Sequence, residues 1–267
     1  MSRAIGRLAD MNAPASVMRL AIERFCLAFD VDLKDAQVPQ GGFDSFNAFF
    51  TRRLRDRARP IDDRPGALVS PADGVIEDCG DIDARSSLLI KDKQYSAAEL
   101  LGDAACAERY RGGQFAIIYL SPRDYHRVHA PAGGPVTRVQ HVPGTLYPVN
   151  SIGEQHIPNL FAVNERVTTL QLDPELGTVA SVMVGAIGVG RIGLCFEDIM
   201  TNVGREPRTH VYEGESQPHL ARGDELGVFY LGSTVVIFIE ADRRIRFEMD
   251  AGSYVQVGQA IGLREPE

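Results

Sequence analysis

The sequence lacks the features that mark several large classes of protein. Its formal net charge is −8, which argues against a nucleic-acid-binding protein, because such proteins carry a basic patch or domain. No apolar run approaches the roughly 20 residues of a transmembrane helix. The N-terminus lacks the continuous apolar region and the small-residue cleavage site of a signal peptide. We therefore expect a protein of the cytoplasm or of a cytoplasmic membrane face, with no nucleic-acid partner.

Cysteines are few, and two familiar catalytic signatures are missing. No Gly-x-Ser-x-Gly elbow surrounds Ser233, and no Met-Lys-Met-like carrier lysine accompanies the strand–turn–strand pattern at 252–261. A conventional nucleophile elbow and a swinging-arm carrier are therefore not expected. The four cysteines form no CxxC pair, which argues against a zinc ribbon or a dense disulfide scaffold. Scattered buried thiols are the simpler interpretation of Cys26, Cys79, Cys106 and Cys195.

Apolar sequence is plentiful enough for a sizeable core. The chain has 267 residues, of which 44% are hydrophobic, and this length fits one large domain or one domain with an appendage. Residues 15–29 have the i, i+3, i+4, i+7 spacing of an amphipathic helix. Residues 1–29 are also locally basic, so this helix either packs on its own domain or lies in a lipid headgroup layer. The apolar face of the helix includes Met18, Ile22, Phe25 and Phe29.

The pattern changes after an arginine-rich segment. Residues 43–59 hold an aromatic cluster typical of a core, followed by five arginines that either face solvent or meet anionic headgroups. From residue 60 onward, short β-branched runs alternate with Gly, Pro and Asp turns, and VVIFI at 235–239 is the most apolar of these runs. We predict an α+β protein with N-terminal amphipathic helices in a membrane-associating region, 1–59. A mainly β core, barrel-like or sandwich-like, should follow at 60–267.

Three clusters carry residues that can do chemistry. The first is SPADG at 70–74, where Asp73 lies on a tight turn and is ordinarily a turn former. The second places His126 and His129 three residues apart, and a metal site is the obvious rival interpretation of such a pair. The other four histidines are isolated, and no further His or Cys cluster completes a ligand set. We therefore expect no metal.

The third cluster is LGST at 231–234, directly before the apolar run at 235–239. Alone, it is a turn that enters a core strand. A serine hydroxyl becomes a nucleophile when a neighbouring base takes its proton, and a carboxylate can orient that base. Asp73, His129 and Ser233 supply these residue types, and Gly232, which has no Cβ, can take a strained conformation that exposes its carbonyl to the hydroxyl. A conventional serine hydrolase would use the same triad, so that alternative stays open.

Together, these clusters resemble the phosphatidylserine decarboxylase family. The similarity runs from about residue 15 to the end of the chain, and the motifs occur in the order found in the family. They are FNAFFTRRL at 46–54, RPID at 59–62, SPADG at 70–74, YLSPRDYHRVHAP at 119–131, LFAVNER at 160–166, VGA at 184–186 and LGST at 231–234.

The resemblance implies a self-cleaving proenzyme with a covalent pyruvoyl cofactor. Ser233 would attack the Gly232 carbonyl, and elimination with loss of ammonia would leave a pyruvoyl group at residue 233. The products would be a β chain, 1–232, and an α chain, 233–267. His129 is implied as the base of this step and Asp73 as its orienting partner. The pyruvoyl ketone would form a Schiff base with the substrate amine and withdraw electrons as CO2 leaves, while His126 would place the carboxylate or deliver a proton.

The resemblance also implies the partners of the chain. The substrate would be phosphatidylserine and the product phosphatidylethanolamine, and the enzyme would be peripheral on the cytoplasmic face of the cell membrane. Met18, Ile22, Phe25 and Phe29 would then meet the membrane surface. The α and β chains are expected to stay associated, and a homodimer stays open. Besides the serine hydrolase, two alternatives remain: a pyruvoyl-dependent decarboxylase of a soluble amino acid, and a non-catalytic lipid-binding β module.

Overall fold

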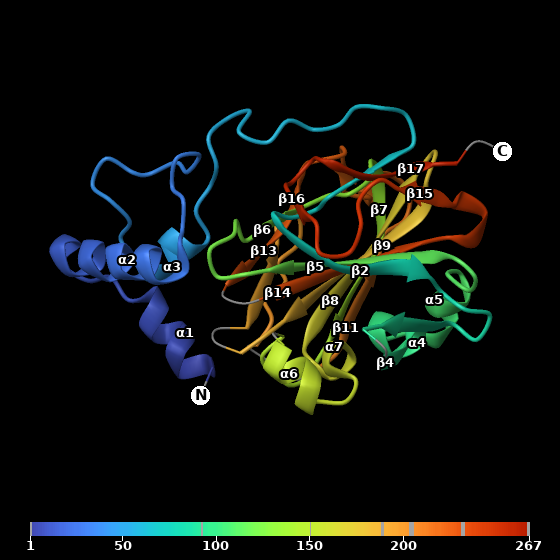
Figure 1. Cartoon of the computed structure of the whole chain (residues 1–267), viewed down its shortest axis with the longest axis horizontal. Coiled ribbons are helices and arrows are strands. Elements are labelled where there is room, and N and C mark those ends of the chain that lie inside the picture. Colours follow the sequence, from blue (N-terminus) through green and yellow to red (C-terminus); the bar gives the residue numbers. More distant parts are fainter. Residues whose placement is uncertain are drawn as a thin grey trace.

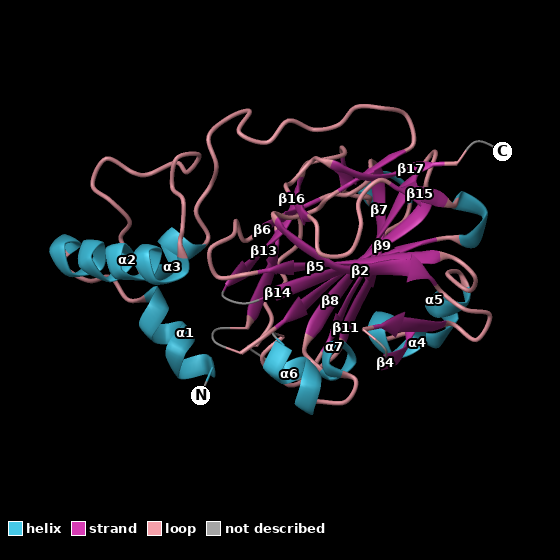
Figure 2. Cartoon of the chain, viewed as in Figure 1, coloured by secondary structure: helices cyan, strands magenta, loops and turns pink. Residues whose placement is uncertain are grey.

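Strands dominate the structure. The computed structural model describes residues 2–91, 93–149, 151–187, 190–202, 206–230 and 233–265. Helix accounts for 19% and strand for 38%, which confirms the predicted α+β class with a mainly β core. The sheets of the described chain are antiparallel and do not close into a barrel, so of the two predicted forms the barrel is not found. Figure 2 shows the strands gathered into one body, with the N-terminal helices standing to one side of it.

The helices to one side are the first three of the chain (Figure 1): α1 (Ser2–Asp10), α2 (Ala15–Phe29) and α3 (Phe46–Phe50). The bounds of α2 are those that the apolar spacing predicts, and the helix ends at Phe29 because the next residue, Asp30, takes a left-handed conformation. α3 begins at Phe46 because the Ser45 side chain accepts a hydrogen bond from the Ala48 N–H over 3.1 Å. No described helix is long and apolar enough to cross a membrane.

A long connection joins these helices to the β-rich body. It spans residues 51–66, and Figure 1 shows it running from α3 along the edge of the strands. The predicted domain boundary after residue 59 falls inside this connection and stays a prediction. Among the described residues, three ion pairs join residues 1–59 to the body: Asp10 with Arg191 over 2.7 Å, Arg53 with Glu225 over 2.9 Å, and Arg59 with Asp73 over 2.6 Å.

One nine-stranded sheet forms the centre of the body. Its order is β11-β7-β8-β9-β14-β5-β2-β16, and β12 also pairs with β7. The strands adjacent to β14 are therefore β5 and β9, and each pairs with it along nearly its whole length. The bounds are β2 (Gly74–Asp81), β5 (Gln114–Leu120), β7 (Gly134–Val142), β8 (Arg166–Asp173), β9 (Gly177–Gly185), β11 (Arg208–Val211), β12 (His219–Leu220), β14 (Ser233–Ile239) and β16 (Tyr254–Val255).

The central sheet has a hydrophobic core on each face. Side chains alternate along a strand, so Val235 and Ile237 of β14 join one core while Val236 and Phe238 join the other. Burial on both faces explains why β14 reads as a continuous apolar run rather than an alternating one.

Two small sheets cover one of these faces, and short helices with a hairpin cover the other. The small sheets are β1 (Ala67–Val69) with β17 (Ala260–Arg264) and β15 (Ile245–Phe247), and β10 (Arg191–Leu194) with β13 (Glu225–Tyr230) and β6 (Arg127–His129). The second cover consists of β3 (Ser87–Ile90), β4 (Lys93–Ser96), α4 (Ala97–Leu101), α5 (Ala104–Glu108) and α7 (Leu160–Val163). The connections contain α6 (Ser151–His156), η1 (Gly214–Ser216) and η2 (Ala241–Arg243).

The cysteines are free, but they are less buried than expected. Cys26, Cys79 and Cys106 are half-buried, and Cys195 is exposed. The expectation of buried thiols was therefore wrong for Cys195, which lies in a connection at the edge of the small β10-β13-β6 sheet rather than in a core.

Candidate active site

Asp73 lies in the turn between β1 and β2, packed closely against the central sheet. The next residue, Gly74, starts β2, and a Cβ there would lie 2.3 Å from the Tyr119 carbonyl oxygen of β5. Only glycine permits this close approach of the two strands. Asp73 is 2% exposed, and its Oδ1 accepts a hydrogen bond from the Val257 N–H over 2.9 Å. The turn therefore holds a buried carboxylate directly before the start of β2.

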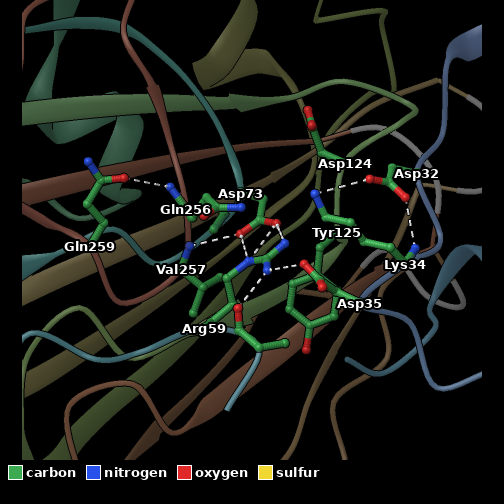
Figure 3. Close-up of polar contacts among 12 residues, drawn as sticks. Asp32, Lys34, Asp35, Arg59, Asp73, Asp124, Tyr125, Gln256, Val257 and Gln259 are labelled. Atoms are coloured by element: carbon green, nitrogen blue, oxygen red, sulfur yellow. Dashed lines mark hydrogen bonds and ion pairs between the residues drawn. The ribbon is translucent and has the colours of Figure 1, made fainter. Parts of the chain in front are cut away.

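Arg59 is the main partner of this carboxylate (Figure 3). Its Nε lies 3.0 and 3.1 Å from the two carboxylate oxygens of Asp73, and its Nη2 lies 2.6 Å from Oδ2. Its Nη1 donates to Asp35 over 2.9 Å. The Arg59 and Asp73 side chains are only 12% and 3% exposed, so this ion pair is shielded from water. Such a two-pronged pair holds the Asp73 side chain in one orientation.

His129 ends β6 and is held as a neutral base. Its Nδ1 lies 2.7 Å from the Gly223 carbonyl oxygen, and because a carbonyl only accepts, Nδ1 carries the proton. Nε2 therefore has the lone pair, and the Tyr125 hydroxyl donates to it over 3.1 Å. Loss of hydration lowers the pKa of His129 below its ordinary value, although Glu225 and Asp73 act in the opposite direction. His129 is thus uncharged near neutral pH, as a general base must be.

His126 is also neutral and is completely buried. Its Nδ1 donates to the Asp124 carbonyl oxygen over 2.9 Å, which again leaves the lone pair on Nε2. Burial lowers the pKa of His126 to about 3. Nε2 has no hydrogen-bond partner among the described residues. The Phe229 N–H donates to the His126 carbonyl oxygen over 2.9 Å, so His126 lies beside the strand β13 that leads toward the predicted cleavage site.

Ser233 is the first residue of β14. It lies opposite Leu120, the last residue of β5, and on its other side opposite Gly185 of β9. Leu231, Gly232 and the Ser233 side chain lie outside the described residues, and so does the predicted cleavage bond. The position of Ser233 is therefore known from the register of its backbone.

The strand register brings the three sequence clusters to one end of β5. Val75, two residues after Asp73, and Thr234, one residue after Ser233, lie on the two sides of Tyr119. Val75 and Thr234 are therefore separated by one strand, β5. Two strand spacings place the backbones of these two residues about 10 Å apart. The chain leaves β5 directly into the loop that carries His126. The three predicted clusters, distant in sequence, thus surround the same strand end.

A direct hydrogen bond between Asp73 and His129 is not found. Both ring nitrogens of His129 are used by Gly223 and Tyr125, and the Asp73 oxygens are used by Arg59 and Val257. The two residues are linked through the backbone instead, since the His129 N–H donates to the carbonyl oxygen of residue 71 over 2.7 Å. The role of His129 as the base and that of Asp73 as its orienting partner therefore remain predictions.

A cavity of about 350 Å³ opens beside His129. Its lining includes the arginine-rich loop, 53–59, together with Tyr125, His129 and Glu225. Arg59 lines it as well, so the cavity reaches the ion pair that holds Asp73. Its volume suits a small polar group or a lipid headgroup.

The predicted membrane residues divide into two groups. Met18 and Ile22 are each 7% exposed and pack on Phe49 and Phe50 of α3, so their face of α2 is not on the surface. Phe25 is half-buried in the same cluster. Phe29 is partly exposed, together with the apolar side chains of Leu8, Met11, Val17, Leu20 and Leu27. At Met18 and Ile22 the helix therefore packs on its own chain, which is the first of the two alternatives given above. A different face of the helices is apolar and exposed.

Three residues at the site are not predicted from the sequence: Arg59, Tyr125 and Gly223. Arg59 is the first residue of the RPID motif and Tyr125 directly precedes His126, so both lie within motifs identified from the sequence. Gly223 acts through its backbone carbonyl, which no side-chain pattern reveals. A metal site is a separate matter, and the described residues contain no group of three or more His, Cys, Asp or Glu placed to hold an ion.

A buried paired carboxylate and two neutral imidazoles lie around one strand end, and groups of these types are able to do acid–base chemistry. Comparison with known proteins adds to this geometry. The family described as Phosphatidylserine decarboxylase matches residues 46–263. The phosphatidylserine decarboxylase proenzyme of Azotobacter vinelandii is 43% identical over 267 residues, covering 98% of this chain and 93% of its own length. That of Bordetella petrii is 44% identical over 247 residues, with coverage of 91% and 85%. That of Pseudomonas aeruginosa is 42% identical over 269 residues, with coverage of 98% and 92%.

The chain belongs to the phosphatidylserine decarboxylase family. The resemblance seen in the motifs is thereby confirmed, and so is the prediction of an enzyme of the carboxy-lyase class. The alternatives of a soluble amino acid decarboxylase and a non-catalytic lipid-binding module are not favoured.

Proposed function

We propose that this chain cleaves its own backbone between Gly232 and Ser233 and then decarboxylates phosphatidylserine to phosphatidylethanolamine and CO2. The observation that carries the proposal is the convergence of the Asp73 turn, the two-histidine loop and the start of β14 at the end of β5. Family membership supports the substrate, since the relatives are named for it.

The cleavage consumes one water and releases one ammonia. The Ser233 hydroxyl oxygen adds to the Gly232 carbonyl carbon, and the peptide C–N bond breaks, which converts the peptide to an ester. Loss of the Ser233 Cα proton then expels the Gly232 carboxylate and leaves a dehydroalanine at residue 233. The dehydroalanine tautomerises to an imine, and water hydrolyses it to ammonia and a pyruvoyl group.

His129 is the base that takes the hydroxyl proton at Nε2. The Gly223 carbonyl fixes the tautomer that leaves the lone pair there. The Tyr125 hydroxyl occupies this nitrogen and must yield it to the Ser233 hydroxyl. Burial raises the pKa of Tyr125, so its hydroxyl stays protonated and cannot compete as a base.

Asp73 assists His129 through its charge rather than through a hydrogen bond. The Asp73 carboxylate raises the pKa of His129 against the larger effect of lost hydration. It therefore stabilises the imidazolium that forms when His129 takes the proton. Arg59 keeps the carboxylate in place, and the Val257 N–H, from the predicted α chain, holds it from the other side.

Residue 233 would hold the pyruvoyl group, whose ketone would supply a partner for the substrate amine and an electron sink for the loss of CO2. The surroundings fit such a group, because the buried Nε2 of His126 has no partner among the described residues and lies on the loop beside β13. His126 holds its lone pair at Nε2 and can orient the substrate amine or carry a proton to the product carbon.

The α and β chains are expected to stay together after cleavage. β14, at the start of the α chain, pairs with β5 over seven residues and with β9 over six. β16 and β17, also in the α chain, pair with β2 and β1. Separation would break these ladders and expose both hydrophobic cores.

We infer that the N-terminal helices attach the enzyme peripherally to the cytoplasmic face of the membrane. The exposed apolar side chains of α1 and α2 provide the surface, and Leu27, at 79% exposure, is the most prominent of them. The basic residues of this segment add attraction to anionic lipids.

The test compares the native chain with Ser233→Ala on vesicles that contain phosphatidylserine and on free serine. The native chain should release CO2 from the lipid and little from free serine, and the variant should release none. Turnover by Ser233→Ala, or equal turnover of free serine, would contradict the proposal.

A further inference from the structure

Arg52 is a buried cation that forms no ion pair with any residue the structure describes. It follows α3 and is 5% exposed. Its Nη2 donates to the carbonyl oxygens of Arg123 and Asp124 over 3.0 and 3.2 Å. Its Nε and Nη1 are buried without a hydrogen-bond partner, and no described carboxylate lies within 4.0 Å to form an ion pair with it. Loss of hydration accordingly lowers the pKa of Arg52.

Arg52 and His126 belong to one cluster. Arg52 Nη2 and His126 Nδ1 both donate to the same carbonyl oxygen, that of Asp124. This shared acceptor fixes the two side chains next to each other. Each of them also keeps buried nitrogen atoms that the described chain leaves unpartnered: Nε and Nη1 of Arg52, and Nε2 of His126.

The nearby carboxylates are committed elsewhere. Asp124 accepts hydrogen bonds from the backbone and hydroxyl of Ser121 over 2.7 and 2.8 Å, and from the Tyr254 hydroxyl over 3.0 Å. Asp73 is held by Arg59. Both carboxylates attract Arg52 through space, but neither is free to bind it.

Burying a guanidinium without a counterion is costly, so a protein ordinarily pairs it. An anion from outside the chain would supply the counterion that the Arg52 guanidinium lacks. The surroundings are apolar on one side, because the Arg52 guanidinium carbon lies 5.4 Å from the centre of the Phe49 ring and the His126 ring lies 4.1 Å from that of Phe50. A ligand with an anionic head beside an apolar body matches this combination.

We propose that Arg52 and His126 form a subsite for the headgroup of the phospholipid substrate. Arg52 binds an anionic oxygen of the headgroup, and His126 accepts a hydrogen bond from its ammonium at Nε2. The two residues thus bind groups of opposite charge on one headgroup. This inference rests on the proposed function. Because both residues are covered, the headgroup must displace covering side chains, of which Phe50 is in direct contact with His126.

The test uses Arg52→Gln and Arg52→Lys, with Arg85→Gln as the matched control, because Arg85 is exposed and lies in the turn before β3. Self-cleavage, followed by intact mass, shows that each variant folds. In variants that cleave, Arg52→Gln should raise the KM for phosphatidylserine about 10- to 100-fold with kcat changed less than about threefold, as expected for a lost charged hydrogen bond. Arg52→Lys should restore part of the affinity, and Arg85→Gln should match the native chain.

Two soluble inhibitors tell which anionic oxygen Arg52 binds. Glycerophosphoserine has a phosphodiester and a carboxylate, whereas glycerophosphoethanolamine has only the phosphodiester. If Arg52→Gln weakens both equally, Arg52 binds the phosphodiester; if it weakens only glycerophosphoserine, Arg52 binds the carboxylate. Either result supports the subsite.

Three results would overturn the subsite. The first is an unchanged KM in Arg52→Gln, and the second is a loss confined to kcat. The third is failure of both Arg52 variants to self-cleave while Arg85→Gln cleaves, which would place Arg52 in the fold or in the cleavage step. If the native chain itself neither cleaves nor releases CO2, the proposed function fails instead, so the two failures are distinct.

Discussion

Among the described residues, replacing Arg59 with alanine removes the side-chain hydrogen bonds to the Asp73 carboxylate and leaves it one backbone N–H, that of Val257. The Arg59 and Asp73 side chains are 12% and 3% exposed, so the variant leaves a carboxylate that is buried and unpaired. Breaking a buried ion pair in this way costs about 3–5 kcal/mol of unfolding free energy. We also expect self-cleavage to slow about 10- to 100-fold, since a hydrogen bond to a charged group contributes about 1.5–3 kcal/mol.

The assay follows the fraction of intact precursor with time, by mass, in freshly translated protein. Free guanidinium ion should restore cleavage of Arg59→Ala in a saturable way, at concentrations too low to unfold the protein. The missing side chain lines a cavity of about 350 Å³, which gives the ion a path to Asp73. Sodium chloride at equal concentration should not restore cleavage.

Asp35→Asn is the matched control. Asp35 shares Arg59 with Asp73, but its side chain is 35% exposed, so its loss should change stability by less than about 1 kcal/mol. A native cleavage rate in Arg59→Ala would refute the reasoning. So would a slow rate that guanidinium leaves unchanged, because Arg59 would then act only through folding.

The remaining predictions concern the base, the acid response and the membrane face. Tyr125→Phe should cleave at least as fast as the native chain, because the Tyr125 hydroxyl occupies His129 Nε2 over 3.1 Å; a rate ten times slower would make Tyr125 a participant. His126 has its pKa lowered to about 3 in the folded chain, so below its unfolded value near 6.5 only the unfolded chain takes up the proton. Stability should therefore fall as pH drops from 6.5 toward 3, by up to about 1.4 kcal/mol per pH unit, and urea unfolding of His126→Gln should show a flatter dependence. Leu27→Ser should weaken vesicle co-sedimentation about tenfold without lowering stability, whereas Met18→Ser should destabilise the fold by about 2–4 kcal/mol. Unchanged sedimentation of Leu27→Ser would place another face on the lipid.

The local pattern of apolar residues predicts a helix or strand of this fold well where the segment is buried on one face or on both. The 15–29 helix has the predicted bounds, and the apolar run at 235–239 lies inside β14. The partner of the helix could not be predicted in the same way. Its spacing identifies one apolar face, and either lipid or α3 could cover that face. Met18 and Ile22 are covered by α3, which begins 17 residues after α2 ends, so no periodicity in α2 reveals it.

The site shows the same division. Residue types mark Asp73, His126 and His129, because few residue types can serve as acids and bases. The partners of these residues depend on contacts between distant segments. Arg59 reaches Asp73 from the connection after α3, and the Gly223 carbonyl reaches His129 from 94 residues away. The sheet order that places β5 between β2 and β14 likewise depends on long-range pairing.

The most direct test of the central claim is the intact mass of the purified, denatured protein. Self-cleavage at Gly232 predicts two chains, of residues 1–232 and 233–267, with the short chain carrying a ketone that reacts with a hydrazide probe. Ser233→Ala should give one full-length chain of 29.2 kDa. A native protein that is folded, yet remains a single full-length chain without a reactive carbonyl, would contradict the account.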